Sequence, residues 1–270
     1  MGNIFRFFLF SAITVFLVGC YFFNKEMSCE EILINSYEES SLNNFEKNKF
    51  KDLLENRYPQ YDEMFASASR ETNIEKNLLA AISFQESQWD PRAKSNMGVR
   101  GMMMVTLETA ALVGVEKRLN PEQNIKGGAK YFLMLQNKNK IGPSEADKLS
   151  IVLASYNLGP TNIIKIASQI DSDIENVTWE DIKEKLKVTT GEDLNMMDNG
   201  SYSRAQQAID YVDRVKSYYQ LMSAHACVNP KDQLTFFQAK LFYLYKLQLF
   251  RIPFFLPKQT SHLLIFVKSQ

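Results

Sequence analysis

One glutamate lies where a carboxyl group could transfer protons. If residues 73–91 form a helix, the i, i+3, i+7, i+10 spacing places four residues on one face: Leu79, Ile82, Glu86 and Trp89. Glu86 would then lie on an apolar stripe, where burial disfavours the charged form and raises the pKa toward the working pH of a general acid. A glutamate in this position can also be a structural residue that pairs with an arginine or a backbone donor.

The composition excludes several other kinds of chemistry. With two His, three Cys and no CxxC or HExxH spacing, we expect no metal site and no cofactor. The 31 Lys and Arg balance the 31 Asp and Glu, and the pI is about 6.8. No overall positive field therefore exists to attract nucleic acid, and we expect no nucleic-acid partner. The sequence identifies no protein partner.

The elements that must position Glu86 are predicted to be helices, so the fold class is all-α. Apolar residues follow helical periodicity, Gly and Pro interrupt the pattern, and no β-hairpin signal is convincing. Thr178 with Asp181, and Ser144 with Asp147, have the spacing of helix-opening capping boxes. We expect helices near residues 61–71, 74–88, 106–112, 121–138, 144–158, 160–169, 178–187 and 203–222.

The N-terminus has the pattern of a targeting segment. An uncharged apolar run from Phe7 to Phe23 follows Arg6, as in a secretory signal. Residues 17–20 read LVGC, which resembles the lipobox of bacterial lipoproteins, so residues 1–20 are predicted to be a signal peptide with Cys20 as the lipidated residue. The alternative is an uncleaved transmembrane anchor. Both predict a membrane-attached protein that faces the cell envelope.

The segments that flank the helical part have a different composition. Residues 21–60 are charged and rich in Asn, which predicts a tether with one short helix. Residues 223–270 become rich in Phe, Leu and Lys, with no acidic residue after Asp232. They are either a basic amphipathic segment on a membrane or a poorly specified tail. Cys29 and Cys227 bracket the domain, and whether they pair is left open.

Four motifs follow one another in order along the helical part. They are ESQWDP (86–91), GVRGMMM (98–104), ASYNLG (154–159) and the Tyr-Val pair at 211–212. Residues 61–222 therefore resemble the lysozyme-like catalytic domain of the soluble lytic transglycosylase family. The GVRGMMM form is most similar to the membrane-bound F type of that family. The F type carries a solute-binding-like domain ahead of the catalytic one, and we expect that domain to be lacking here.

The resemblance implies an enzyme that cleaves the glycan strands of peptidoglycan between N-acetylmuramic acid and N-acetylglucosamine. Glu86 would protonate the leaving oxygen and then, as a base, take the proton of the C6 hydroxyl, so that a 1,6-anhydro ring closes without water. The resemblance also implies that no second carboxylate is needed, unlike in most glycosidases. The lipobox lacks an acidic residue after Cys20, which suggests the outer membrane, facing the periplasm.

The resemblance also assigns roles to residues around Glu86. Gly98 and Gly101 would let backbone amides approach an N-acetyl group, and Met102 and Met103 would line the groove. Tyr211 would hold Glu86 and sustain its raised pKa. The full set of expected binding and supporting residues is Ser87, Gly98, Gly101, Met102, Met103, Tyr156, Asn157 and Tyr211.

Two rival functions remain open at this point. A muramidase would use a positioned water molecule and release reducing ends. An inactive peptidoglycan-binding scaffold lipoprotein would keep the groove without turnover. Glu86, Tyr156, Asn157 and Tyr211 are all present, which favours an active enzyme.

Overall fold

A computed structural model of the protein describes residues 27–96, 98–189 and 203–229. The chain divides into two units, residues 1–225 and 226–270, and the description below concerns the first. Its described residues form helices without a β-strand, apart from isolated bridges between Lys94 and Arg100 and between Arg100 and Val105. The predicted all-α class is therefore confirmed.

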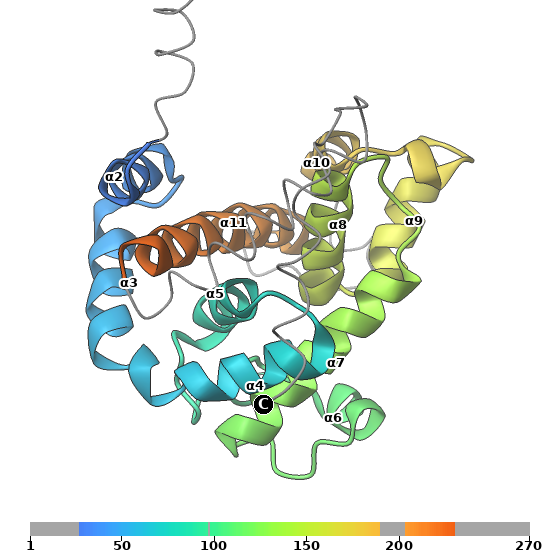
Figure 1. The fold of residues 1–270 in the computed structure, drawn as a ribbon. Coiled ribbons are helices and arrows are strands. Elements are labelled where there is room, and N and C mark those ends of the chain that lie inside the picture. The colour runs from blue at the N-terminus through green and yellow to red at the C-terminus, as the bar shows by residue number, and fades with distance from the viewer. Residues whose placement is uncertain (1–26, 97, 190–202, 230–270) are drawn as a thin grey trace, which may run out of the picture. The chain divides into compact units, whose positions relative to one another are not determined.

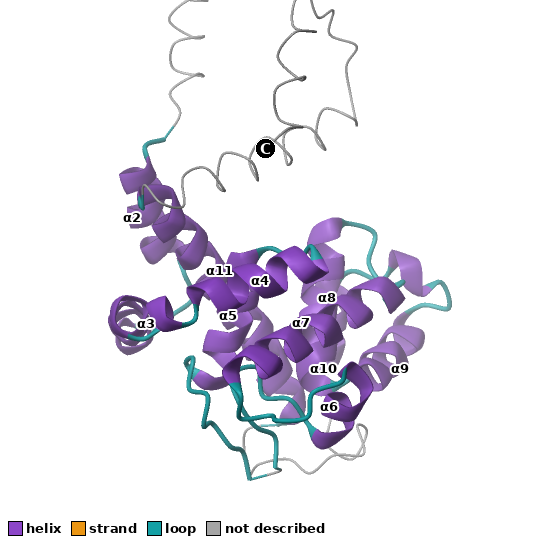
Figure 2. Cartoon of the chain, turned by 60° about the horizontal axis from the view of Figure 1, so that its bottom comes forward, coloured by secondary structure: helices purple, strands orange, loops and turns teal. Residues whose placement is uncertain are grey.

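The helices follow the predicted ranges closely from residue 61 onward. In chain order they are α4 (Asp62–Thr72), α5 (Lys76–Ser87), α6 (Leu107–Val113), α7 (Pro121–Lys138), α8 (Glu145–Leu158), α9 (Pro160–Ile170), η2 (Ile174–Asn176), α10 (Trp179–Lys187) and α11 (Arg204–Val228). α11 continues six residues beyond the expected end at residue 222. Figure 2 shows that purple helices make up almost all of the described chain, joined by teal loops.

The segment expected to be a tether contains two helices. α2 (Cys29–Glu39) and α3 (Asn44–Asn56) both begin with a capping box, and η1 (Tyr58–Gln60) follows. Phe50 and Leu53 of α3 are buried, and Phe50 stacks on Tyr218 of α11 with ring centroids 5.4 Å apart. Phe50 and Leu53 thus belong to the packed core, where the Phe50 ring contacts Tyr218 of α11 and Phe84 of α5.

α5 is the central helix and carries Glu86. All of its residues from Leu78 to Phe84 are buried, as expected of a helix enclosed on every side. Figure 1 shows α5 between α4, α3 and α11. Because the helix cannot shift within this packing, the residues at its C-terminal end have fixed positions.

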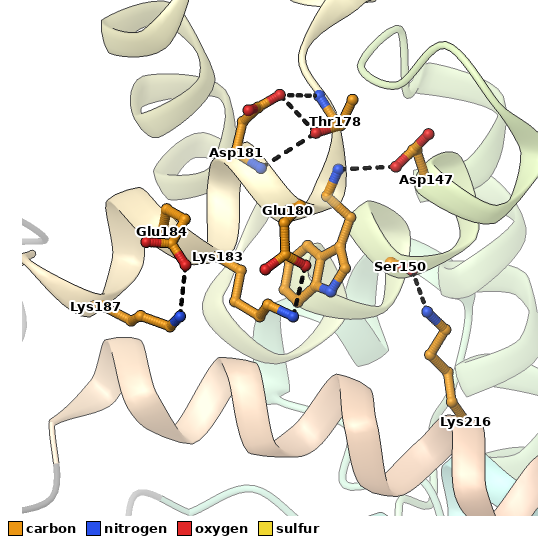
Figure 3. Close-up of polar contacts among 10 residues, drawn as sticks. Asp147, Ser150, Thr178, Glu180, Asp181, Lys183, Glu184, Lys187 and Lys216 are labelled. Carbon is orange, nitrogen blue, oxygen red and sulfur yellow. Dashed lines mark hydrogen bonds and ion pairs between the residues drawn. The ribbon is translucent and has the colours of Figure 1, made fainter.

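Polar contacts link α8 to α10 and α8 to α11 (Figure 3). The predicted capping box of Thr178 and Asp181 opens α10. Asp147 of α8 accepts a hydrogen bond of 2.9 Å from the backbone amide of Trp179, and Lys216 of α11 donates one of 2.9 Å to Ser150 of α8. These contacts fix α11 against α8, the two helices that supply tyrosines to the site. Elsewhere, Cys29 and Cys227 are both disulfide-bonded.

Candidate active site

Glu86 is fixed by the way α5 ends. The next residues, Gln88 and Trp89, both have positive φ, at 54° and 57°, a conformation that is rare for a side chain as bulky as tryptophan. The Trp89 ring is wholly buried, its indole nitrogen donates to the Ala80 carbonyl at 2.9 Å, and it packs on Phe84 at 4.7 Å between centroids. Trp89 thus stabilises the turn that ends α5 just beyond Glu86.

The carboxyl group of Glu86 is set for proton transfer. Its side chain is partly exposed, so a substrate can reach it, yet the surrounding protein raises the pKa from 4.5 to about 7 through burial, while Tyr211 acts in the opposite direction. The Glu86 charge in turn helps to raise the pKa of Tyr156 and Tyr211 well above 10.0, although burial is the larger cause for both. Three of the predicted site residues are therefore neighbours.

Two buried polar atoms of the predicted site residues lack a well-formed hydrogen bond within the described part of the chain. They are the Tyr211 hydroxyl and the side-chain oxygen of Asn157. The Tyr211 hydroxyl is close enough to lower the pKa of Glu86 but does not reach good hydrogen-bond geometry. The prediction that Tyr211 sustains the raised pKa is therefore wrong in its direction, because burial is what raises this pKa and a hydrogen bond to the carboxylate lowers it. Buried polar groups are normally paired, so these atoms mark a position where a polar ligand would complete the bonding.

The loop that carries the GVRGMMM motif is held by three side chains through its carbonyl groups. Ser83 and Ser87 donate to the Met102 carbonyl at 3.0 Å and 2.7 Å. The Tyr156 hydroxyl donates to the Met103 carbonyl at 2.9 Å. Ser87 and Tyr156 therefore join α5 and α8 to the loop, and neither hydroxyl donates to Glu86.

The glycines and methionines of this loop are placed differently from the prediction. The amides of Gly98 and Gly101 donate to Ser95 and Ala93 at 3.0 Å and 2.9 Å, so they are used inside the loop. Gly101 has φ of +85°, and a Cβ there would lie 2.3 Å from the Arg118 carbonyl oxygen, so its need for glycine arises from packing.

The side chains of Met102 and Met103 are both 0% exposed. They are core residues and do not line an open groove. Their contribution to the site is made by their backbone carbonyls, which accept the hydrogen bonds from α5 and α8 described above.

Asn124 of α7 was not among the predicted site residues, yet it holds the same loop. It is wholly buried. Its side-chain oxygen accepts from the Met103 amide at 2.7 Å, and its amide group donates to the carbonyls of Arg100 and Arg118 at 3.0 Å and 2.8 Å. The sequence signal that could have identified Asn124 is a polar residue on the apolar face of a long predicted helix.

The raised pKa of Glu86 predicts a change in stability for Glu86→Gln. Between pH 4.5 and about 7 the folded protein keeps a proton that the unfolded chain has lost, so the wild-type free energy of unfolding falls as pH rises. Glutamine removes this dependence, and at pH 8 the variant should be more stable by about 2 kcal/mol, with no gain at pH 4. Urea unfolding at both pH values measures the difference. Glu38→Gln, at an exposed glutamate of α2, should show no gain, and an equal gain in both variants would contradict the assignment to Glu86.

Comparison with known proteins gives a consistent family. Residues 63–177 match the family described as "Transglycosylase SLT domain". Membrane-bound lytic murein transglycosylase F of Saccharophagus degradans is 34% identical over 185 residues, which cover 68% of this chain and 37% of that protein. The same-named protein of Photobacterium profundum is 35% identical, covering 68% of this chain and 35% of that protein. The chain thus spans about a third of the length of these relatives.

Similar solved structures include an inactive mutant of lytic transglycosylase Slt from Pseudomonas aeruginosa. The TM-score is 0.45 at 16% identity, over 77% of this chain and 33% of that one. The 70 kDa soluble lytic transglycosylase of Escherichia coli gives a TM-score of 0.45 at 22% identity, over 73% of this chain and 31% of that one. The sequence matches confirm the resemblance predicted from the four motifs.

Proposed function

We propose that this chain is a peptidoglycan lytic transglycosylase, because residues 63–177 match the transglycosylase SLT domain family. The observation that carries the proposal is that Glu86, a partly exposed residue, has a carboxyl pKa raised to about 7 beside the Tyr211 hydroxyl. A carboxyl group with this pKa is protonated in about half of the molecules at neutral pH and can serve as acid and as base.

Both proton transfers go through Glu86. It gives its proton to the glycosidic oxygen as the bond from C1 of N-acetylmuramic acid breaks. The C6 hydroxyl of the same sugar then bonds to C1, and the carboxylate of Glu86 takes the hydroxyl proton. A 1,6-anhydro end forms, no water is consumed, and Glu86 regains its proton. No acidic side chain of the described residues is among the causes of the Glu86 pKa shift, which suits a mechanism with one carboxylate.

The neighbouring polar groups have supporting roles in this proposal. The unpaired side-chain oxygen of Asn157 would accept a hydrogen bond from the sugar, and the Tyr211 hydroxyl would donate to Glu86 once its carboxylate forms. The Tyr156 ring lies 5.5 Å from that of Tyr131, between centroids, and would form an aromatic wall of the groove. Ser87 would hold the GVRGMMM loop in place next to the end of α5 through its hydrogen bond to the Met102 carbonyl.

We propose that the protein acts in the bacterial envelope, facing the periplasm, as the names of the F-type relatives suggest. No helix among residues 27–96, 98–189 and 203–229 has the length and apolar character needed to cross a bilayer. Residues 1–20, predicted to be a signal peptide with Cys20 as the lipidated residue, lie outside the described residues. The signal peptide, the lipidation and sorting to the outer membrane therefore stay part of the proposal. The same holds for residues 230–270 of the tail. Residues 61–222 are proposed as the catalytic domain.

Product analysis tests the reaction. The full chain is incubated with purified sacculi, and the released muropeptides are identified by mass spectrometry. Anhydro ends would support the transglycosylase, reducing ends would indicate a muramidase, and the absence of release would favour a binding scaffold.

Tyr211→Phe should change the pH dependence of the reaction. The hydroxyl lowers the pKa of Glu86, so its loss should raise that pKa and move the alkaline fall of kcat/KM to higher pH by about one unit. Rates from pH 5 to 9 measure the shift. Tyr219→Phe, on the same helix but bonded to Glu75, is the control. A lower rate with an unmoved profile would contradict a role for Tyr211 in setting the pKa of Glu86.

A further inference from the structure

A hollow is lined by residues of α3 and α11 and by the C-terminal end of α5, the helix that carries Glu86. It has a volume of about 280 Å³ and is lined by side chains of α3, α5 and α11, among them Phe45, Lys49, Gln85, Gln88, Arg214 and Tyr218. Gln85 is the direct neighbour of Glu86. Arg214 and Tyr218 follow Tyr211 at i+3 and i+7, so they share its face of α11. The hollow therefore lies along the part of α11 that follows Tyr211, within about two helical turns of that residue.

Hydrogen-bond donors and positive charge dominate this hollow. Glu46 is its single acidic lining residue, and it is already bound to the Asn43 amide at 2.9 Å and to Arg214 Nε at 3.1 Å. Arg214 pairs with Glu46 through Nε, and the half-buried Lys49 has no acidic partner within the described part of the chain. The side-chain amides of Gln85 and Gln88 likewise make no hydrogen bond there. The unmatched charge is positive, so a ligand should bring a carboxylate.

One wall of the hollow is apolar and exposed. Phe45 is 76% exposed although it lies beside the buried ring of Tyr218 in the lining. Exposed aromatic rings at a pocket rim commonly contact a ligand. This wall belongs to α3, which precedes the matched residues 63–177.

We propose that this hollow binds the carboxylate-bearing peptide stem of the peptidoglycan strand that is cut at Glu86. Lys49 and Arg214 bind the carboxylate, Gln85 and Gln88 bond to the peptide backbone, and Phe45 contacts an apolar side chain. The proposal rests on the proposed function, since it names the part of the same substrate that lies beside the cleaved bond.

Binding to a chain that cannot turn over tests the proposal. The full chain with Glu86→Gln is titrated calorimetrically with a tetrasaccharide of alternating N-acetylglucosamine and N-acetylmuramic acid, with and without its peptide stems. We expect the stems to tighten binding about tenfold, as one charge-assisted hydrogen bond would. Adding Lys49→Glu should remove that gain and leave stem-free binding unchanged. Phe45→Ala, at an exposed position where folding is not at risk, should reduce the gain about threefold.

Lys138→Glu supplies the matched control, because Lys138 lines a separate cavity of about 330 Å³ beside α7 and α9. It should leave both affinities unchanged. If Lys49→Glu weakens the binding of stem-bearing and stem-free strands equally, the hollow binds glycan and not the stem. If Lys49→Glu weakens neither, the hollow does not contact the strand. Either result overturns the proposal. Product analysis of the wild type separately reports failure of the proposed reaction, because binding is measured without turnover.

Discussion

Replacing Glu86 with glutamine is expected to lower kcat on sacculi by about 10⁴-fold, to the level of an enzyme-free control. Glutamine keeps the size of the side chain but can neither give nor take the proton, and the proposed reaction uses this one group for both transfers. Release of anhydromuropeptides, counted by mass spectrometry against time, measures the loss. The fold should survive, because the variant is expected to be more stable than the wild type at pH 8.

Two controls separate loss of chemistry from loss of binding. Glu38→Gln, on the exposed face of α2, should retain full activity. The Glu86→Gln protein should still sediment with sacculi, since Asn157 and Tyr156 remain in place. Residual turnover within about tenfold of the wild type would contradict the assignment of Glu86 and point to another acid.

The helices after residue 60 could be predicted because each carries its own local signals. Pro121 begins α7 and Thr178 caps α10, and these positions agree with the structure. The packing of α3 could not be read in this way. Its main buried side chains, Phe50 and Leu53, are too few to give a strong periodic pattern, and the ring that covers Phe50 is Tyr218, far along the chain.

The site was predictable where side-chain type decides the chemistry. Glu86, Tyr156 and Tyr211 come from α5, α8 and α11, and the structure brings them together. The predicted roles of the loop glycines and methionines differ from the structure because of backbone hydrogen bonds. The sequence does not reveal that the Gly101 amide already donates to Ala93. Nor does it reveal that Met102 bonds to α5 through its backbone carbonyl.

Asn124 is a residue outside the four motifs that holds the GVRGMMM loop through hydrogen bonds to the backbone. Three backbone groups depend on it: the Met103 amide and the Arg100 carbonyl of this loop, and the Arg118 carbonyl in the connection before α7. The same loop receives the hydroxyls of Ser87 and Tyr156. A change at Asn124 should therefore reach Glu86 through the loop, although the two residues need not touch.

Asn124→Leu should lower the free energy of unfolding by about 4 kcal/mol, because a similar volume is kept while three buried backbone groups lose their partner. We also expect kcat/KM to fall at least about tenfold because the loop shifts. The pH profile should not change, since Asn124 is not among the causes of the Glu86 pKa shift, which are burial and Tyr211. Urea unfolding and muropeptide release measure the two effects. Asn56→Leu is the control, because Asn56 bonds only to Asp52 on an exposed face of α3. If both variants lose the same small amount of stability, Asn124 does not hold the loop, and the carbonyl bonds from Ser83, Ser87 and Tyr156 must suffice.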